Sequence, residues 1–151
     1  MNDILIVVDM QKDFVDGSLG TKEAVSIVSN VCEYIKQHKG DIFVTLDTHG
    51  ENYMESSEGK NLPVMHCIKG TSGFELNEKV LTALSDRSYT VIEKPSFGSI
   101  ELPKIIKEKY GLQVNITLIG LCTDICVISN ALILKANFPE AAISVIESCC
   151  A

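Results

Sequence analysis

Between two apolar runs, at 114–119 and 127–135, the sequence reads Gly120-Leu121-Cys122-Thr123-Asp124-Ile125-Cys126-Val127. The first run predicts a buried strand and the second a buried helix, so the residues between them form a tight strand-to-helix turn. In open α/β folds such turns lie at the carboxyl edge of the sheet, where active sites are found. This stretch therefore predicts both a fold class and the location of a site.

Within the turn, Thr123 is a suitable N-cap, and Cys126 falls three residues later, in the first turn of the expected helix. A thiol there faces free backbone N–H groups and the positive end of the helix dipole, which favour the reactive thiolate. Cysteine is also a residue that is often buried as a small apolar side chain. Cys126 is therefore either a nucleophile or a core residue, and its placement favours the nucleophile.

The rest of the sequence alternates strand and helix patterns without internal repeats. Apolar and β-branched runs predict strands at 4–8, 42–46, 89–93, 114–119 and 142–146. Helix-type spacing predicts helices at 21–39, 76–85, 100–109 and 123–136. We therefore expect one α/β domain over 1–151, with a mostly parallel central sheet between two helical layers. The chain ends soon after the last expected strand, so we expect this domain either to be truncated there or to be completed by a partner subunit.

The composition is that of a globular protein, with 46% hydrophobic and 22% charged residues. The net charge of -7 argues against nucleic acids and anionic membranes as partners. No apolar run is long enough to cross a bilayer, and the first residues lack the basic region of a signal peptide. The six cysteines are then expected to be reduced, and the protein to be cytoplasmic.

Three expected strand ends carry reactive side chains, namely Asp9, Lys94 and the turn with Cys126. Because parallel strands end at one edge of a sheet, these side chains can converge. A carboxylate can accept the proton of a thiol, and a lysine beside it stabilises the thiolate and keeps the carboxylate ionised. The alternative is that Asp9 and Lys94 form a structural ion pair.

A long polar segment, 49–72, follows the second expected strand, and connections of this length are uncommon unless they are functional. Asp47 and His49 stand where the segment begins, and Glu58 and His66 lie within it. Phe14, in the loop after the first strand, is either a packing residue or a surface for a ligand. We therefore expect the segment to contribute to the site.

Four separate segments of the chain, taken together, resemble the isochorismatase-like cysteine hydrolases, and among them most closely the nicotinamidases. They are Val8-Asp9-Met10-Gln11-Lys12-Asp13-Phe14, Asp47-Thr48-His49, Glu93-Lys94 and the turn at 120–127. The resemblance covers nearly the whole chain and implies an isochorismatase-like fold of Rossmann-like topology. It also implies a catalytic triad of Asp9, Lys94 and Cys126.

The same resemblance implies further features of the site. A non-proline cis peptide bond is expected at Leu121–Cys122, and an oxyanion hole from the backbone N–H groups of Cys122 and Cys126. Phe14 and Leu121 are expected to contact the substrate.

The resemblance also implies a divalent metal, bound by Asp47, His49 and His66 with Glu58 as the fourth ligand. These ligand types suit Zn²⁺, Fe²⁺ or Mn²⁺ and do not choose between them. The alternative is that these side chains are solvated charges of the loop.

The function implied is hydrolysis of a small carboxamide through a Cys126 thioester, with nicotinamide as the first substrate and nicotinate and ammonia as products. Another small amide or carbamoyl compound is an alternative substrate. A phospho-acceptor signalling domain is an alternative from another class, since it also has acidic strand ends and a Lys-Pro pair such as Lys94-Pro95. Such domains usually need two adjacent acidic residues, whereas Met10 follows Asp9.

We also expect a homo-oligomer, because a strand at the chain end leaves an apolar edge or face uncovered.

Overall fold

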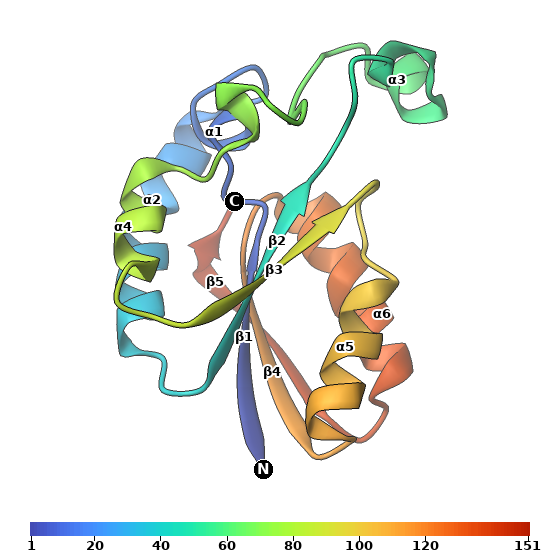
Figure 1. The fold of residues 1–151 in the computed structure, drawn as a ribbon. Coiled ribbons are helices and arrows are strands. Elements are labelled where there is room, and N and C mark those ends of the chain that lie inside the picture. Colours follow the sequence, from blue (N-terminus) through green and yellow to red (C-terminus); the bar gives the residue numbers. More distant parts are fainter.

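All five strands of the computed structural model, which describes residues 1–151, run parallel in one sheet (Figure 1). Their order across the sheet is β3-β2-β1-β4-β5. The strands are β1 (Asn2–Val8), β2 (Asp41–Asp47), β3 (Tyr89–Lys94), β4 (Val114–Gly120) and β5 (Ala142–Cys150). From β1 the next strands in the chain, β2 and β3, are added on one side, and β4 and β5 are added on the other. Doubly wound folds bind their ligands at the point where this order reverses, which here lies between β1 and β4.

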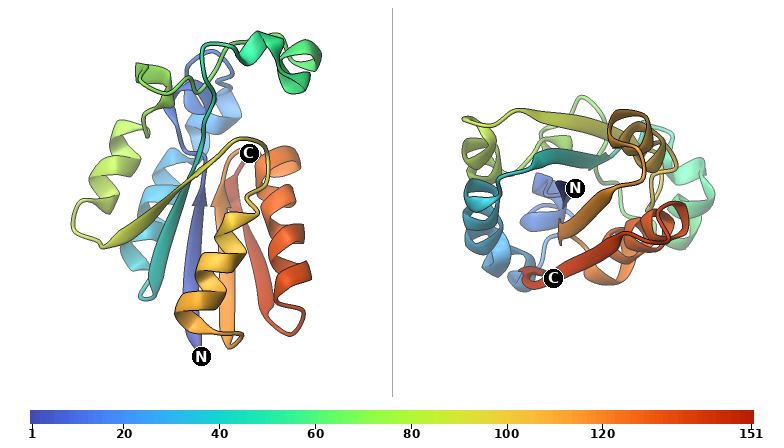
Figure 2. Two further views of the ribbon diagram at one scale, coloured as in Figure 1. Left: turned by 45° about the vertical axis from the view of Figure 1, so that its right-hand side comes forward. Right: turned by 90° about the horizontal axis from the view of Figure 1, so that it is seen from below.

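Helices cover both faces of this sheet (Figures 1 and 2). One face is covered by α2 (Lys22–Gln37) and α4 (Glu78–Leu84), and the other by α5 (Glu101–Tyr110) and α6 (Ile128–Asn137). Each face has its own hydrophobic core cluster, and β1 contributes alternate side chains to both. The predicted three-layer α/β/α architecture is therefore confirmed. None of the helices is both long and apolar enough to span a membrane.

The pattern of burial explains why the strands and helices form where they do. In β1, residues 4–8 are almost completely buried because both faces of a central parallel strand are covered. In α2, the Thr21 side chain accepts a hydrogen bond from the N–H of Ala24 at 2.9 Å and so caps the helix.

The structure differs from the sequence prediction in two connections and in the end of one strand. The residues after β1 form a short helix, α1 (Lys12–Val15), instead of a loop, and the 49–72 segment contains η1 (Tyr53–Glu55) and α3 (Ser57–Asn61). A further short helix, η2 (Ser72–Phe74), closes that segment. β5 was predicted to end at 146 but continues, because Cys150 still pairs with Gly120 after an irregularity in the register.

Candidate active site

The carboxyl ends of β1, β3 and β4 bring Asp9, Lys94 and Cys126 to one place. The Lys94 ammonium donates to Asp9 Oδ2 at 2.6 Å and to the carbonyl of Ser96 at 3.0 Å. The hydroxyl of Thr45 donates to the other oxygen of Asp9, Oδ1, at 2.6 Å. Asp9 and Lys94 have no exposed side-chain surface. Both carboxylate oxygens of Asp9 are thus held in a fixed direction.

The charges of these three groups affect one another. Burial raises the pKa of Asp9 above its ordinary value, although the Lys94 ammonium opposes this shift. Burial acts to lower the pKa of Lys94, but Asp9, Cys126 and Asp47 together outweigh it, and the pKa of Lys94 is raised. Burial also raises the pKa of the Cys126 thiol, and the Asp9 carboxylate adds to this effect. This direction is opposite to the expectation that the turn favours a thiolate, because burial and the charge of Asp9 outweigh the effect of Lys94 on the pKa of Cys126.

The turn after β4 has an unusual backbone. The Leu121–Cys122 peptide bond is cis, as predicted. Gly120 has a φ of 121°, and a Cβ there would lie 2.1 Å from the carbonyl oxygen of Val8, so glycine is required.

The helix after this turn begins with a π-helical turn, η3 (Thr123–Val127), before α6. Its N-cap is Cys122 and not Thr123, because the Cys122 carbonyl accepts from the N–H of Val127 at 3.0 Å. The N–H of Cys122 itself donates to no protein carbonyl.

The thiol of Cys126 opens into a cavity of about 210 Å³. Its lining comprises Phe14, Leu19, Asp47, Leu62, His66, Phe97, Cys122, Ile125 and Cys126. Phe14 thus lies on the cavity wall, whereas the Leu121 side chain packs into the core cluster on the α2 side and does not line the cavity. The reason is that the N–H of Leu121 still donates to the carbonyl of Val8 at 2.9 Å, which keeps Leu121 beside β1 in the core.

Four of the wall residues were not predicted: Leu19, Leu62, Phe97 and Ile125. Phe97 lies three residues after Lys94, and Ile125 directly precedes Cys126, so closeness to the triad in sequence was an available signal. Leu19 and Leu62 belong to two other loops, and nothing in the sequence connects these loops.

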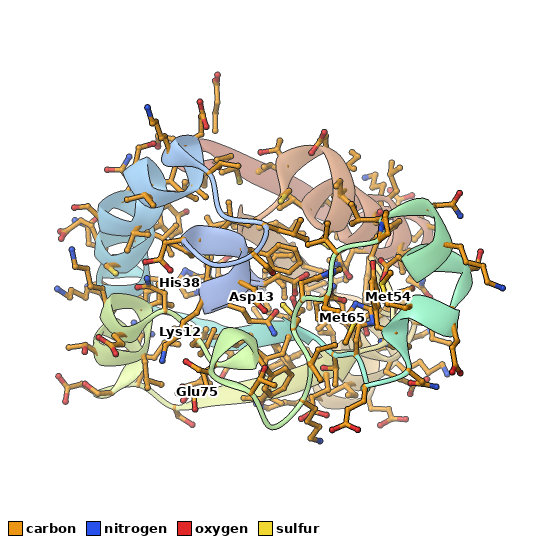
Figure 3. All side chains as sticks on the ribbon, turned by 90° about the horizontal axis from the view of Figure 1, so that it is seen from above. Lys12, Asp13, His38, Met54, Met65 and Glu75 are labelled. Atoms are coloured by element: carbon orange, nitrogen blue, oxygen red, sulfur yellow. The ribbon has the colours of Figure 1, made fainter.

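Seen from above, the connection after β1, with Asp13, runs near the end of the 49–72 segment, with Met65 (Figure 3). The Asp13 carboxylate in α1 accepts from the N–H of Cys67 at 2.8 Å, and the Ser18 hydroxyl donates to the carbonyl of Met65 at 3.0 Å. These bonds tie the connection after β1 to the end of the 49–72 segment. The cavity roof is therefore formed by two segments that are far apart in the sequence.

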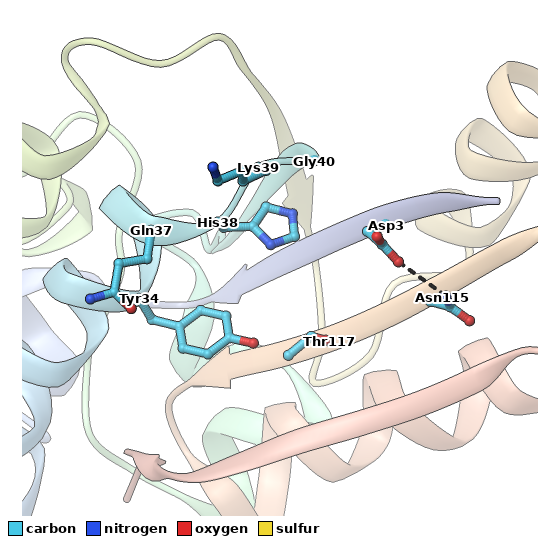
Figure 4. A pocket seen from close by; sticks show the side chains of 8 residues that line it. All are labelled: Asp3, Tyr34, Gln37, His38, Lys39, Gly40, Asn115 and Thr117. Atoms are coloured by element: carbon cyan, nitrogen blue, oxygen red, sulfur yellow. Dashed lines mark hydrogen bonds between the residues drawn. The ribbon is translucent and has the colours of Figure 1, made fainter.

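A second hollow, of about 430 Å³, lies at the opposite edge, where β1 and β4 begin and α2 ends (Figure 4). Its lining is mostly polar and includes Asp3, His38 and Asn115. His38 is half-buried, and its Nε2 has no hydrogen-bond partner. None of the nucleophile or metal-ligand candidates reaches this hollow, so the smaller cavity is the candidate active site.

Next to the triad, Asp47, His49 and His66 have ligand atoms within 4.8 Å of one another. Asp47 Oδ2 lies 3.0 Å from His49 Nε2 and 3.3 Å from His66 Nε2. Glu58 Oε2 lies 3.1 Å from His49 Nε2, so all four ligand candidates from the sequence come together.

The donor set of this cluster fits a divalent cation. Asp47 Oδ1 and both carboxylate oxygens of Glu58 are buried without a hydrogen-bond partner. Two imidazole nitrogens with carboxylate oxygens are a common ligand set for Zn²⁺ and related ions. His66 Nδ1 lies 2.7 Å from the carbonyl of Val64, which leaves Nε2 free to bind a metal.

Residues around the cluster hold its ligands in place. The Gln11 amide donates to the Asp47 carbonyl and accepts from the Asp47 N–H, both at 2.8 Å. The ring of Tyr53 lies 4.8 Å from the His49 ring and 4.9 Å from the His66 ring, between centroids. Burial acts to raise the pKa of Asp47, but hydrogen bonds with His49 and His66 outweigh it and lower this pKa to about 2. Asp47 is therefore an anion at any ordinary pH.

A buried carboxylate–lysine pair beside a cysteine, on the strand-to-helix turn of a parallel sheet, is the arrangement of a cysteine hydrolase. Residues 3–151 match the isochorismatase domain, and the chain belongs to the isochorismatase family. The alternative of a phospho-acceptor signalling domain is therefore wrong.

Similar proteins agree with this assignment. The chain is 31% identical over 146 residues to an uncharacterized isochorismatase family protein, PncA, of Bacillus subtilis (strain 168), covering 87% of this chain and 77% of that protein. The pyrazinamidase/nicotinamidase structure from Streptococcus mutans UA159 has a TM-score of 0.85 at 28% identity, over 99% and 87% of the two chains. The pyrazinamidase of Pyrococcus horikoshii in complex with zinc has a TM-score of 0.78 at 27% identity, over 99% and 86%. The predicted resemblance to nicotinamidases is thus confirmed.

Proposed function

We propose that this protein hydrolyses nicotinamide to nicotinate and ammonia through a thioester on Cys126. The observation that carries the proposal is the shared cavity: Cys126 lines it together with Asp47 and His66, two of the candidate metal ligands. A volume of about 210 Å³ suits one small ring with its carboxamide, and most of the lining is apolar. Two structures of similar fold are pyrazinamidases, one of them also a nicotinamidase, which supports an aromatic amide substrate.

In the proposed reaction, Asp9 accepts the proton of the Cys126 thiol as sulfur attacks the carboxamide carbon. Asp9 then gives this proton to the leaving nitrogen, the C–N bond breaks, and ammonia departs. A water molecule next attacks the thioester while Asp9 accepts its proton. The C–S bond breaks, the acid is released, and the proton returns to the sulfur. The raised pKa of Asp9 supports this exchange, since the carboxylate must both accept and donate.

The neighbouring groups act through orientation and charge. Lys94 and Thr45 hold the two oxygens of Asp9, so that the carboxylate keeps one direction through both steps. We assign the oxyanion hole to the backbone N–H groups of Cys122 and Cys126, and the lack of a protein acceptor for the Cys122 N–H supports this role.

We further propose that Asp47, His49, Glu58 and His66 hold a divalent metal. When bound, the metal supplies a Lewis acid for the ring nitrogen of the substrate. Asp47 and His66 belong both to the ligand cluster and to the cavity wall, so they join the two parts of the site. The zinc in the similar Pyrococcus horikoshii structure supports Zn²⁺ as the first ion to test, followed by Fe²⁺ and Mn²⁺.

The test compares nicotinamide with benzamide, which has the same shape but no ring nitrogen. Elemental analysis and ammonia release are measured on the purified protein before and after chelation. We expect bound metal, faster release from nicotinamide, and a loss on chelation that is reversed by metal and is specific for nicotinamide. Equal rates for both amides, unchanged by chelation, would indicate another small amide or carbamoyl substrate, and no ammonia from any amide would refute amide hydrolysis.

We also propose that a second copy of the chain covers the free edge of the sheet. β5 is an edge strand, and its Val145 is exposed on the side of α6. Beside it, α6 and the turn before it expose Ile125, Ile128 and Leu132, which extend this apolar face. Two-fold pairing of the same edge would cover it in both copies. Sedimentation should show a dimer that Leu132→Glu dissociates, and a dispersed native monomer would refute this proposal.

A further inference from the structure

Asn130 in α6 is a fully buried amide that joins two parts of the site. Its Nδ2 donates to the carbonyl of Cys126 at 2.8 Å and to the carbonyl of Phe97 at 3.1 Å. Its Oδ1 accepts from the N–H of Ser99 at 2.9 Å. A buried amide is costly unless its groups are bonded, and here the bonds lead to the nucleophile turn and to the connection between β3 and α5.

That connection, 95–100, carries two groups that the site needs. The side chain of Phe97 forms a wall of the cavity, and the carbonyl of Ser96 accepts from the Lys94 ammonium. Phe97 is 41% exposed, so burial alone holds its side chain weakly. Gly98 brings the connection close to α6, since a Cβ there would lie 2.4 Å from Ile133 Cδ1. The backbone bonds to Asn130 therefore set where this wall stands.

We infer that Asn130 is a positioning residue for the reaction, because its side chain fixes the Phe97 wall relative to Cys126. Asn130 contacts backbone groups and not the Cys126 sulfur, so it is not a catalytic residue. This inference rests on the proposed function, since the Phe97 wall matters only to a substrate with a ring.

The substitution Asn130→Ser separates the two parts of this contact. A serine hydroxyl in a helix can still donate to the carbonyl four residues earlier, which is Cys126, but it is too short to bridge to Phe97 and Ser99. Asn137→Ser is the matched control, because the Asn137 amide donates to the Ile133 carbonyl at 2.9 Å in the same helix and bridges to no second segment.

The enzyme assay uses nicotinamide and propionamide, an aliphatic amide without a ring. We expect Asn130→Ser to raise KM for nicotinamide by about 10-fold or more, as small misplacements of positioning groups do. The parameters for propionamide and the rate of Cys126 alkylation by iodoacetamide should stay within about twofold, as should all values for Asn137→Ser. An equal loss for both amides in Asn130→Ser would mean a merely structural role and would overturn the inference.

A double-mutant cycle with Phe97→Ala tests whether Asn130 acts through the wall. If it does, Asn130→Ser should raise the nicotinamide KM little further once Phe97 is alanine, whereas independent effects would multiply and refute the inference. If Asn130→Ser folds poorly, Asn130→Thr keeps the same backbone bond and fills more of the amide volume, and the same outcomes apply.

Hydrogen exchange tests the hydrogen bonds between Asn130 and the 95–100 connection without any enzyme assay. The Ser99 amide should exchange about 10-fold faster in Asn130→Ser than in the native protein, while α6 amides are unchanged. Unchanged exchange at Ser99 overturns the inference even if nicotinamide is the substrate. If the native protein hydrolyses no amide while Ser99 exchanges faster in the variant, Asn130 does fix the position of the 95–100 connection, and it is the proposed function that fails.

Discussion

Asp9, Lys94 and Cys126 stand on the sheet and the turn that follows it, whereas His49, Glu58 and His66 stand on the 49–72 segment, which is bonded to the connection after β1 at Met65 and Cys67. The triad residues are almost completely buried and are fixed by bonds to neighbouring strands. In the 49–72 segment, η1 and α3 pack mainly against each other and project from the body (Figures 1 and 2). The two halves of one site thus differ in what orders them.

The triad and the metal cluster also differ in how their charges are balanced. Lys94 balances the negative charge of Asp9 at 2.6 Å, so the triad needs no added ion. In the metal cluster, Asp47 Oδ1 and the Glu58 oxygens lack hydrogen-bond partners. Lys94 Nζ lies 3.8 Å from Asp47 Oδ1 and His49 Nε2 lies 3.1 Å from Glu58 Oε2, so a bound cation would add positive charge that these two carboxylates otherwise lack. We therefore expect the triad to persist when the metal is removed and the 49–72 segment to loosen.

The largest effect should come from the triad alone. Cys126→Ala should lower ammonia release from nicotinamide by about 10⁴-fold or more, since no other group supplies the nucleophile. The metal content, read by elemental analysis, should equal that of the native protein because the ligands belong to the other half. Loss of metal in this variant would contradict the separation of the two halves.

Asp9→Asn should lower turnover by about 10³-fold, because the amide cannot accept the thiol proton. Its effect on the thiol itself should have the opposite sign. The Asp9 charge contributes to the raised pKa of Cys126, and Lys94 remains, so removing Asp9 lowers this pKa. Iodoacetamide labelling of Cys126, followed by mass spectrometry across a pH series, should shift to lower pH. An unchanged profile would show that the Asp9 charge does not act on the thiol, and a shift to higher pH would show that Asp9 instead favours the thiolate.

The dependence of kcat/KM on pH in the native protein also tests the role of Asp9 as the base. Burial raises the pKa of Asp9, so kcat/KM should already fall at a pH above the ordinary range of aspartate titration, as protonation removes the base. The acid limb of this profile should be absent from the residual activity of Asp9→Asn.

His49→Ala should lower nicotinamide turnover by about 10²-fold, through loss of the metal and misplacement of the ring. Labelling of Cys126 by iodoacetamide should remain at the native rate, because Asp47, the cluster residue beside Lys94, stays in place in this variant. His38→Ala is the control, since His38 lines the hollow at the opposite edge of the sheet. If Cys126 labelling falls together with turnover in His49→Ala, the segment supports the fold of the whole site.

The smallest effect should follow from Gln11→Ala. The Gln11 amide holds both backbone groups of Asp47, so its loss should weaken metal affinity by about 10-fold, as loss of outer-shell partners does. Gln37→Ala is a matched control, because its amide donates to the exposed Glu33 carboxylate. Metal titration by calorimetry compares the two variants, and equal affinities would show that Asp47 needs no such support.

The sequence predicts best what depends on burial. Residues 4–8 form an unbroken apolar run, and they became the central strand because both helical layers cover it. The candidate ligands also came together as predicted, because Asp47 ends a strand and the two histidines stand at the ends of one segment.

The rest depends on tertiary contacts that leave no local pattern. The π-helical turn at 123–127 forms because the Cys122 carbonyl accepts from the N–H five residues later, that of Val127, and not from the N–H four residues later. Any helix-forming sequence permits both bonds. Leu19 and Leu62 meet across the cavity only because α1 and the 49–72 segment are tied together above it. The raised pKa of Cys126 depends on its burial, which the spacing of residues in the turn does not reveal.

The ring of Tyr53, which lies against both histidines, gives the metal cluster an optical signal. The chain has no tryptophan and four tyrosines, so its ultraviolet fluorescence comes from tyrosine. Tyr53 is the tyrosine whose ring lies against His49 and His66. Ions with unpaired electrons, such as Fe²⁺ or Mn²⁺, should quench its emission on binding, whereas Zn²⁺, with its filled d shell, should not. A fluorimetric titration of the protein can therefore follow loading and separate these classes of ion without any substrate.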